Sequence, residues 1–300
     1  MHAGRYPLVW GVVGTGVLLA VFFLVALLLT AVLTGEEGSA ESGGKIGVVV
    51  LEGVISSELS EQAVRQLAKH RDDPTIKAII LRVDSPGGGV ASSQEVYEEV
   101  KRLRAGGKLV VASLGSVAAS GGYYIACVAD RIFANAGTLT GSIGVIVQLA
   151  NAEELLRKIG VESTAITSGP FKDSGNPTRP LRPEERQVFQ ALIDDVYQQF
   201  VEAVSQGRQM PLEEARRLAD GRIYTGRQAK ELRLIDELGT FQDAITYTAT
   251  TIGISGKPTL VREEKERFWW LKFVLDRFPA TSLFRSLSHV DAVLQYRWPY

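Results

Sequence analysis

The sequence predicts an α/β protein with a mainly parallel sheet, helices on both faces of the sheet, and one transmembrane helix in front of it. Two observations lead to this fold class. From about residue 45 onward, short apolar runs of strand length alternate with segments of helical spacing, and this alternation is typical of parallel sheets covered by helices. Before that point, residues 8–33 form an uncharged stretch rich in Val, Leu, Ala and Phe, which is long enough to cross a bilayer core.

The segments of strand length are expected to form the strands of the sheet. The first, 46–51, reads Ile-Gly-Val-Val-Val-Leu, a mostly apolar run as expected for a strand that is buried on both faces. In chain order, the expected strands are 46–51, 78–83, 108–114, 131–134, 143–147 and 162–167.

The segments between these runs are expected to form helices, because their apolar residues recur at helical spacing. Leu59, Ala63 and Leu67 lie on one side of the first such segment. Pro183 and Pro211 mark the start of two later helices, a place where the missing N–H of proline costs no hydrogen bond. In chain order, the expected helices are 59–70, 92–104, 123–129, 153–159, 183–206, 212–219, 225–232 and 240–250.

The uncharged stretch 8–33 is longer than the apolar core of a secretory signal peptide, so we expect it to be retained as an anchor in the cell membrane. Ala31 leaves cleavage as the alternative. Arg5 precedes the stretch and acidic residues follow it, which puts residues 1–7 in the cytoplasm and the rest of the chain on the extracytoplasmic side. The expected topology is single-pass, with membrane lipid as the partner of residues 8–33.

Three further segments follow the anchor. Residues 34–44 are rich in Gly, Ser and Glu and are expected to be a linker. Residues 45–262 carry the strand–helix alternation and form the expected soluble domain. The tail 263–300 is aromatic and basic, which suits an amphipathic helix at a membrane surface. Packing on a neighbouring subunit is an equal alternative for this tail, and covering of a substrate groove is a third.

Composition narrows the range of functions. The formal net charge is −1, which gives no electrostatic basis for binding nucleic acid, and we expect none as a partner. Cys127 is the single cysteine, so an intrachain disulfide is excluded and a cysteine-based metal site is not expected. We expect neither a metal nor a cofactor. Cys127 lies in an apolar run and is expected to be a small buried residue rather than a reactive thiol.

Two glycine-rich turns follow expected strands, at the edge of a parallel sheet where sites form. The first is 85–89, which reads Ser-Pro-Gly-Gly-Gly. Glycines allow backbone N–H groups to face a ligand, and such donors can form an oxyanion hole. A tight strand–helix turn without further function is the alternative. The pattern of a phosphate-binding loop is absent.

The second turn, 116–122, contains Ser120 among small residues. Ser120 is expected at or near a helix N-terminus, where N–H groups favour developing negative charge. Small neighbours leave room for a substrate carbonyl, so Ser120 is a candidate nucleophile. The alternative is that its hydroxyl caps the helix, which is the commoner use of a serine at this position.

A serine nucleophile needs a base to take its proton. None of the three histidines, His2, His70 and His289, is well placed by the expected fold. A lysine serves as the base when its amine is unpaired and removed from water. Lys172 is the best candidate, because it lies in the irregular segment 168–182 just after an expected strand. The alternative is a salt bridge between Lys172 and the adjacent Asp173.

The sequence resembles the short form of the bacterial signal peptide peptidase A family, whose members are Ser–Lys peptidases with a ClpP/crotonase-like fold. The resemblance covers about residues 46–261, the whole expected domain, and the matching motifs occur in the same order and spacing. These motifs are Asp84-Ser85-Pro86-Gly87-Gly88, Ala119-Ser120-Gly121-Gly122-Tyr123-Tyr124, Thr140-Gly141-Ser142-Ile143-Gly144, Ser168-Gly169-Pro170-Phe171-Lys172-Asp173 and Tyr224-Thr225-Gly226-Arg227-Gln228-Ala229. The tail 263–300 lies outside the resemblance.

The resemblance implies a role for five residues. Ser120 would be the nucleophile, Lys172 the general base, and Ser142 the residue that orients the lysine amine. The backbone N–H groups of Gly88 and Gly121 would form the oxyanion hole. The family degrades remnant signal peptides at the membrane and forms ring- or dome-shaped homo-oligomers. In its short form the serine and lysine of one site come from neighbouring subunits, and an apolar groove would bind the peptide.

Three other functions remain open at this point. An acyl-CoA enzyme with a crotonase-like fold would also use a glycine-rich oxyanion hole, but CoA chemistry is cytoplasmic and the expected domain is not. A catalytically inactive membrane scaffold is the alternative of another class, and the intact Ser120 and Lys172 pair argues against it. The same mechanism could also act on a membrane-associated regulatory protein.

Overall fold

The computed structural model describes residues 19, 21–24 and 44–263. The chain divides into two compact units, residues 1–42 and 43–300. Residues 19 and 21–24 of the first unit are helical. The predicted N-terminus, nearly all of the predicted anchor and linker, and the tail after residue 263 lie outside the described residues. Among the helices that the structure describes, none combines the length and apolar character needed to cross a membrane.

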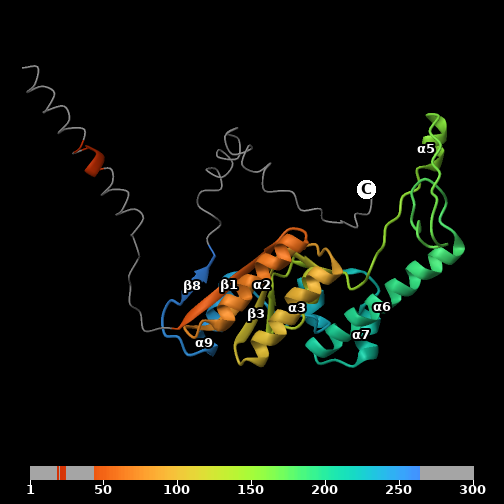
Figure 1. Ribbon diagram of the computed structural model, residues 1–300. Coiled ribbons are helices and arrows are strands. Elements are labelled where there is room, and N and C mark those ends of the chain that lie inside the picture. The colour runs from red at the N-terminus through yellow and green to blue at the C-terminus, as the bar shows by residue number, and fades with distance from the viewer. Residues whose placement is uncertain (1–18, 20, 25–43, 264–300) are drawn as a thin grey trace, which may run out of the picture. The chain divides into compact units, whose positions relative to one another are not determined.

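In the described part of the second unit, one mostly parallel sheet of eight strands forms the centre (Figure 1). Its main order is β6-β5-β3-β2-β1-β8, with β4 beside β3 and β7 beside β4. The β5–β6 pair is antiparallel and the other pairs are parallel. The strands are β1 (Lys45–Glu52), β2 (Ile76–Ser85), β3 (Leu109–Ala119), β4 (Arg131–Ala134), β5 (Leu139–Gly141), β6 (Ile223–Thr225), β7 (Glu237–Leu238) and β8 (Thr259–Arg262).

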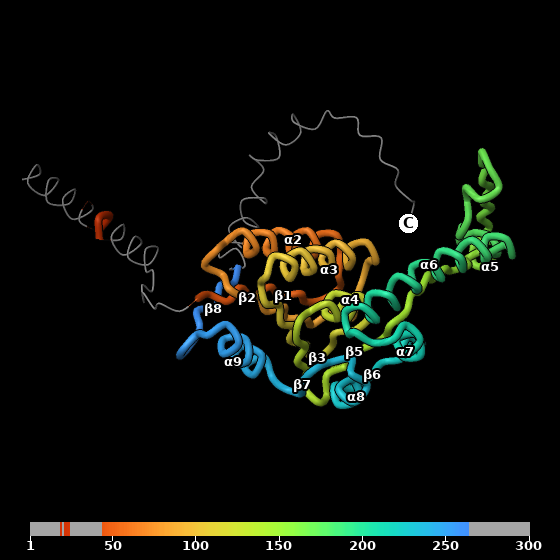
Figure 2. The backbone as a smooth tube through the Cα atoms, turned by 90° about the horizontal axis from the view of Figure 1, so that it is seen from below, coloured from red at the N-terminus to blue at the C-terminus, as the bar shows by residue number. Residues whose placement is uncertain are grey.

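Helices cover both faces of this sheet. Figure 2 shows α2 and α3 on one face and α9 on the other. The helices described in the second unit, within residues 44–263, are α2 (Ser57–Asp72), α3 (Val90–Ala105), α4 (Gly121–Ala126), α5 (Glu153–Lys158), α6 (Pro183–Gly207), α7 (Leu212–Leu218), α8 (Gly226–Glu231) and α9 (Phe241–Thr251). The predicted α/β class with a mainly parallel sheet and flanking helices is therefore confirmed.

Two apolar cores lie on opposite faces of the sheet, and β1 contributes to both. Val49 and Leu51 pack in the larger core with α2 and α3. Ile46 and Val48 pack in the smaller core with α9. Successive side chains of a strand point to opposite faces, so a strand covered on both sides is apolar at nearly every position. This explains why uninterrupted apolar runs identified the three central strands correctly.

Two of the expected strands are wrong. Residues 143–147 and 162–167 form no strand. Ile146 is 82% exposed and Ile166 is 98% exposed, and neither segment has a strand partner among the described residues. An apolar run becomes a strand only where a neighbour supplies hydrogen bonds, and here the sheet residues are 139–141 instead. The short strands β6, β7 and β8, of two to four residues each, were not predicted.

The helix α6 packs on the core through its C-terminal half. The side chains of Phe200, Val201, Ala203 and Val204 are buried, whereas in the first half only Glu185 is buried. The preceding α5 buries none of its residues. Figure 1 shows α5 and the start of α6 extending beyond the sheet. The segment between these helices, which contains Lys172, therefore lies away from the sheet edge.

Candidate active site

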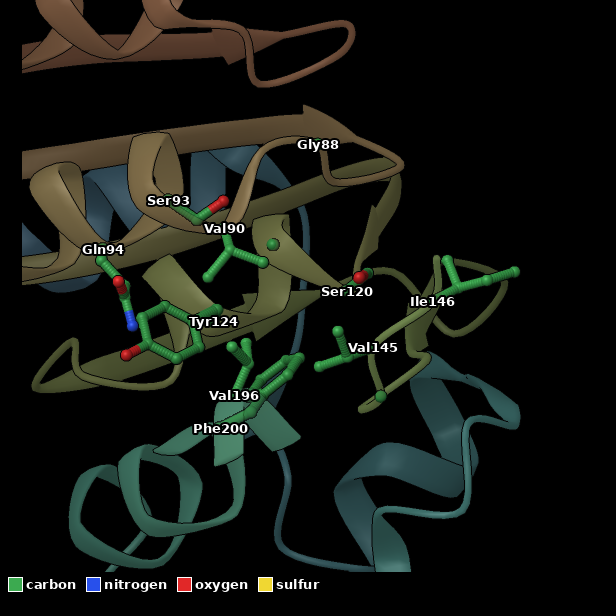
Figure 3. Close-up of a pocket in the computed structure, with 12 residues that line it drawn as sticks. Gly88, Val90, Ser93, Gln94, Ser120, Tyr124, Val145, Ile146, Val196 and Phe200 are labelled. Carbon is green, nitrogen blue, oxygen red and sulfur yellow. The ribbon is translucent and has the colours of Figure 1, made fainter. Parts of the chain in front are cut away.

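A pocket opens at the carboxyl ends of β2 and β3, where parallel sheets commonly form sites. Ser120 lies in it between the turn that contains Gly88 and the side chains of Val145 and Ile146 (Figure 3). The walls come from α3, α4, α6 and the segment after β5. The residues that line the pocket are Gly88, Val90, Ser93, Gln94, Ser120, Gly121, Tyr124, Gly144, Val145, Ile146, Val196 and Phe200.

Ser120 has a backbone conformation that side chains rarely adopt. Its φ is 51° and its ψ is −120°, a strained combination of the kind that recurs at functional sites. Its N–H donates to the carbonyl of Gly141 over 2.8 Å, and its own carbonyl accepts from Tyr124 N–H over 2.8 Å. These bonds hold a sharp turn from β3 into α4, the arrangement that presents the nucleophile in many hydrolases.

The hydroxyl of Ser120 does not cap α4. The helix begins directly after Ser120, but no hydrogen bond joins the serine side chain to its first turn. Ser120 therefore does not serve as a helix cap, which was the alternative role that the sequence left open. Its side chain instead faces the pocket, where a substrate carbonyl would lie.

Gly88 and Gly121 bring two backbone N–H groups together beside Ser120. A Cβ atom on Gly87 would lie 2.7 Å from the nitrogen of Gly121, and a Cβ on Gly121 would lie 3.3 Å from the nitrogen of Gly88. Within the described part of the chain, neither N–H group donates a hydrogen bond. Two close, unused donors next to a serine side chain are what a developing oxyanion requires.

Ser142 lies next to this group of residues. Gly141, the residue before it, pairs with Ala119 in the sheet and accepts the hydrogen bond from Ser120. The φ of Ser142 is 50°, and its N–H donates to the carbonyl of Arg222 over 2.8 Å. The fold thus brings the two serines to adjacent strand ends, each with a positive φ.

Lys172 is not among the residues that line this pocket. It is exposed, and its segment is fastened near Glu185 in the first turn of α6. Val196 of the same helix lines the pocket, and a helix rises 1.5 Å per residue, so Glu185 and Val196 are about 16 Å apart. Four of the five predicted site residues therefore meet within the chain, and Lys172 does not join them.

The remaining sequence candidates have other surroundings. His70 is buried in α2, and His2 and His289 lie outside the described residues. Cys127 is fully buried, as expected, and this burial raises the pKa of its thiol to about 12. Neither His70 nor Cys127 is part of the pocket around Ser120.

The walls of the pocket were not predicted from the sequence. Tyr124 and Phe200 form one wall, with ring centroids 5.0 Å apart. The amide of Gln94 donates to Gln199 Oε1 over 2.7 Å at the same end. These residues come from three helices that are distant in the chain, and no local pattern connects them. An apolar groove was expected only through the family resemblance.

The fold and the pocket define a serine peptidase with a ClpP-like α/β arrangement. The family model of Clp protease matches residues 44–140, which contain β1 to β4 and the serine turn. The model of Peptidase family S49 matches residues 102–255. The chain belongs to peptidase family S49 and is a peptidase of the signal peptide peptidase A type within it, as the motif resemblance predicted.

Individual relatives agree with this assignment. The chain is 48% identical to "Putative protease slr0021" of Synechocystis sp. over 210 residues. This aligned region covers 70% of this chain and 75% of that protein. It is 41% identical over 223 residues to "Putative signal peptide peptidase SppA" of Enterococcus faecium, covering 71% and 64%. It is 38% identical over 217 residues to "Protease 4" of Salmonella typhi, covering 70% of this chain but 35% of that longer protein.

Proposed function

We propose that this protein is a membrane-anchored serine endopeptidase that uses Ser120 and Lys172 as a catalytic pair. The observation that carries the proposal is the strained Ser120, which faces an open pocket beside the unused N–H groups of Gly88 and Gly121. Its substrates are remnant signal peptides and similar apolar peptides. The anchor is the uncharged stretch 8–33, and the peptidase domain acts on the extracytoplasmic side.

The reaction is an acyl transfer in two stages. Ser120 Oγ attacks the peptide carbonyl while the Lys172 amine takes its proton, and the N–H groups of Gly88 and Gly121 stabilise the resulting oxyanion. Lys172 then gives its proton to the leaving amine, which breaks the peptide bond and leaves an acyl-enzyme. A water molecule, deprotonated by Lys172, releases the product. Ser142 accepts a hydrogen bond from the lysine ammonium and orients it. The reaction needs no metal or cofactor.

The site is shared between neighbouring subunits of a homo-oligomer. This part of the proposal is supported by the position of Lys172, which lies beyond the start of α6 while Ser120 lies beside its later turns. It is also supported by apolar side chains that a single chain leaves exposed in the segment before Lys172, namely Ile159, Ile166 and Phe171. A neighbouring copy would cover such a surface and receive the lysine.

Apolar peptides are the substrate class that fits the pocket. The apolar side chains of Val90, Val145, Ile146, Val196 and Phe200 line it, together with the polar side chains of Ser93, Gln94, Ser120 and Tyr124. Signal peptides are rich in leucine and alanine, which an apolar wall binds by burying their side chains. The printed name of the Enterococcus relative points to the same substrate.

The test is hydrolysis of a leucine- and alanine-rich signal-like peptide by the purified full chain in detergent. Ser120→Ala and Lys172→Ala should each lower kcat by about a thousandfold or more, as removal of a nucleophile or base does elsewhere. Ser116→Ala is the matched control and should keep full activity, because Ser116 is an exposed serine of β3, four residues before Ser120, and does not line the pocket.

The pH profile tests the identity of the base. Activity that depends on an unprotonated lysine should rise into the alkaline range. Wild-type turnover in either Ser120→Ala or Lys172→Ala would refute the catalytic pair. Full activity on polar peptides with none on apolar ones would refute the substrate class while leaving the pair intact.

A further inference from the structure

A cluster of two arginines and two carboxylates surrounds the segment that carries Lys172. Arg179 lies at its centre and contacts both acids. Its Nε donates to Asp173 Oδ2 over 2.9 Å, and its Nη1 donates to Glu185 Oε2 over 2.9 Å. Arg182 adds a second guanidinium, whose Nε donates to Glu185 Oε1 over 2.9 Å. The two positive and two negative charges balance within the cluster.

The cluster is largely shielded from water on its acidic side. The side chain of Glu185 is fully buried, while those of Asp173 and Arg179 are 20% and 25% exposed. Glu185 also accepts a hydrogen bond from the backbone N–H of Arg182 over 3.0 Å. Buried charges persist when each is paired and hydrogen-bonded, and here every carboxylate oxygen has a partner. The arrangement is therefore a fixed one.

The same arginines hold the backbone on both sides of Lys172. Arg179 Nη2 donates to the carbonyl of Asp173 over 3.0 Å, and Arg182 Nη2 donates to the carbonyl of Pro170. Lys172 lies between these two anchored carbonyls. Its side chain is left outside the cluster, and among the described residues its amine has no hydrogen bond or ion pair.

Asp173 is the carboxylate closest in sequence to the proposed base, and the cluster decides which cation it pairs with. Both of its oxygens are occupied by Arg179, one at 2.9 Å from Nε and the other at 2.9 Å from Nη2. A planar guanidinium binds a carboxylate through two such bonds at once, which an ammonium cannot do. The hydrogen bond from Arg179 also holds the pKa of Asp173 below its usual value. Among the described residues, Asp173 pairs with Arg179 and no ion pair joins it to Lys172, which was the alternative that the sequence left open.

We propose that Arg179, held in place by Glu185, is a positioning residue that keeps the Asp173 carboxylate away from the Lys172 amine. An ammonium paired with a carboxylate retains its proton more tightly and is a poorer base near neutral pH. The Arg179 pairing leaves Lys172 free to lose its proton and to reach a nucleophile. This inference rests on the proposed function, because it assigns Arg179 a role through Lys172.

The test compares the pH dependence of kcat/KM for the full chain and three variants. In Arg179→Gln, Asp173 is released to pair with Lys172, so the rise in activity should move to higher pH by about one unit or more. Adding Asp173→Asn to Arg179→Gln should move it back toward the wild-type position. Arg179→Lys keeps the positive charge but loses the planar guanidinium that binds both carboxylate oxygens. Its pH profile should therefore shift less than that of Arg179→Gln.

A second measurement reports on the amine without activity. Competitive acetylation of Lys172 across a pH series, read by mass spectrometry, gives the pKa of the amine directly in each variant. Arg65→Gln removes an arginine from an exposed ion pair with Glu61 and is the matched control. It should change neither the pH profile nor the acetylation curve. Arg179→Lys provides the comparison if Arg179→Gln does not fold.

The outcomes separate this inference from the proposed function. If Lys172→Ala is inactive but Arg179→Gln and Arg179→Lys both keep the wild-type pH profile and acetylation curve, the positioning role is wrong and the catalytic pair stands. The role is also wrong if Asp173→Asn fails to reverse the shift. If Lys172→Ala keeps its activity, the catalytic pair is refuted, and this inference falls with it.

Discussion

At the scale of single residues, the site around Ser120 depends on contacts that leave no room for an extra atom. A Cβ on Gly121 would lie 2.4 Å from Ser93 Oγ, closer than real Cβ contacts. Ser93 cannot easily move aside, because it is nearly buried and its hydroxyl donates to the carbonyl of Gly89 over 2.9 Å. Ser93 therefore lies directly beside Gly121, which supplies one of the two N–H groups proposed as the oxyanion hole.

This contact leads to a pair of substitutions with opposite effects. Gly121→Ala should lower kcat about a hundredfold, because the added methyl displaces the Gly121 N–H from the oxyanion, and loss of one such donor costs that much elsewhere. Ser93→Gly removes the atom that collides with the methyl, so the double variant should recover part of the lost kcat. The measurement is steady-state hydrolysis of the signal-like peptide. A double variant that is no better than Gly121→Ala would mean that Ser93 is not the obstacle.

The site shows what the sequence could and could not reveal at this scale. Glycine-rich turns after two expected strands pointed to Ser120 and to the turn that contains Gly88, whereas the roles predicted for Gly88, Gly121 and Ser142 came from the family resemblance alone. The role of Asp173 was left open, because adjacent residues in a sequence do not reveal whether their side chains meet. In the structure Asp173 pairs with Arg179, which lies six residues further along the chain and belongs to none of the motifs.

At the scale of elements, α2 packs against β1 through a buried histidine. A Cβ on Gly47 of β1 would lie 2.7 Å from Cδ2 of His70, so the ring rests directly on the strand. Within the described residues, neither ring nitrogen has a hydrogen-bond partner. Burial is the main cause that lowers the pKa of His70, and nearby Lys69 and Lys108 act in the same direction while Asp73 and Glu263 oppose them.

This packing predicts a loss of stability in mild acid. The unfolded chain takes up a proton on His70 near pH 6.5, whereas the folded chain does so only at lower pH, so the free energy of unfolding should fall as pH drops below about 6.5. His70→Leu should show a smaller fall between pH 7.5 and 5.5. Urea unfolding followed by circular dichroism at the two pH values measures the difference. Equal falls in the wild type and the variant would contradict the prediction.

The elements also show where sequence patterns fail. The central strands were predicted well because burial on both faces produces apolar runs, and Val48 and Val49 of β1 illustrate it by packing in different cores. The segment 143–147 carries a similar run, but only Ile143 is fully buried, while Ile146 and Val147 are exposed, and residues 162–167 are exposed throughout. A sequence does not distinguish an apolar run buried in its own sheet from one that a single chain leaves uncovered.

At the scale of the whole molecule, the separation of Ser120 from Lys172 makes a prediction about mixed assemblies. Ser120→Ala and Lys172→Ala should each be inactive alone but regain activity when co-expressed, because a Lys172→Ala chain would supply serine and a Ser120→Ala chain would supply lysine. With equal amounts and random head-to-tail assembly, about a quarter of the sites would combine both intact residues. The measurement is peptide hydrolysis by the purified mixture.

The control for this experiment uses a chain that lacks both groups. Co-expression of Ser120→Ala with the double variant Ser120→Ala/Lys172→Ala supplies no serine and should give no activity. Failure of the first mixture to recover any activity, with assembly confirmed by light scattering, would mean that each site is built from a single chain.

If a site takes Ser120 and Lys172 from two subunits, the length of α6 affects how the subunits assemble. Glu185, which fixes the lysine segment, and Val196, which lines the serine pocket, are separated by about three helical turns. A helix is stiff and turns by about 100° per residue, so in the proposed shared site α6 would set both the distance and the rotation between the lysine that a subunit donates to its neighbour and the subunit's own serine pocket. In a closed assembly those two quantities determine the angle from one protomer to the next. The helix would thus act as a ruler for the number of subunits, and adding or removing one residue in it would change the size of the ring or prevent it from closing.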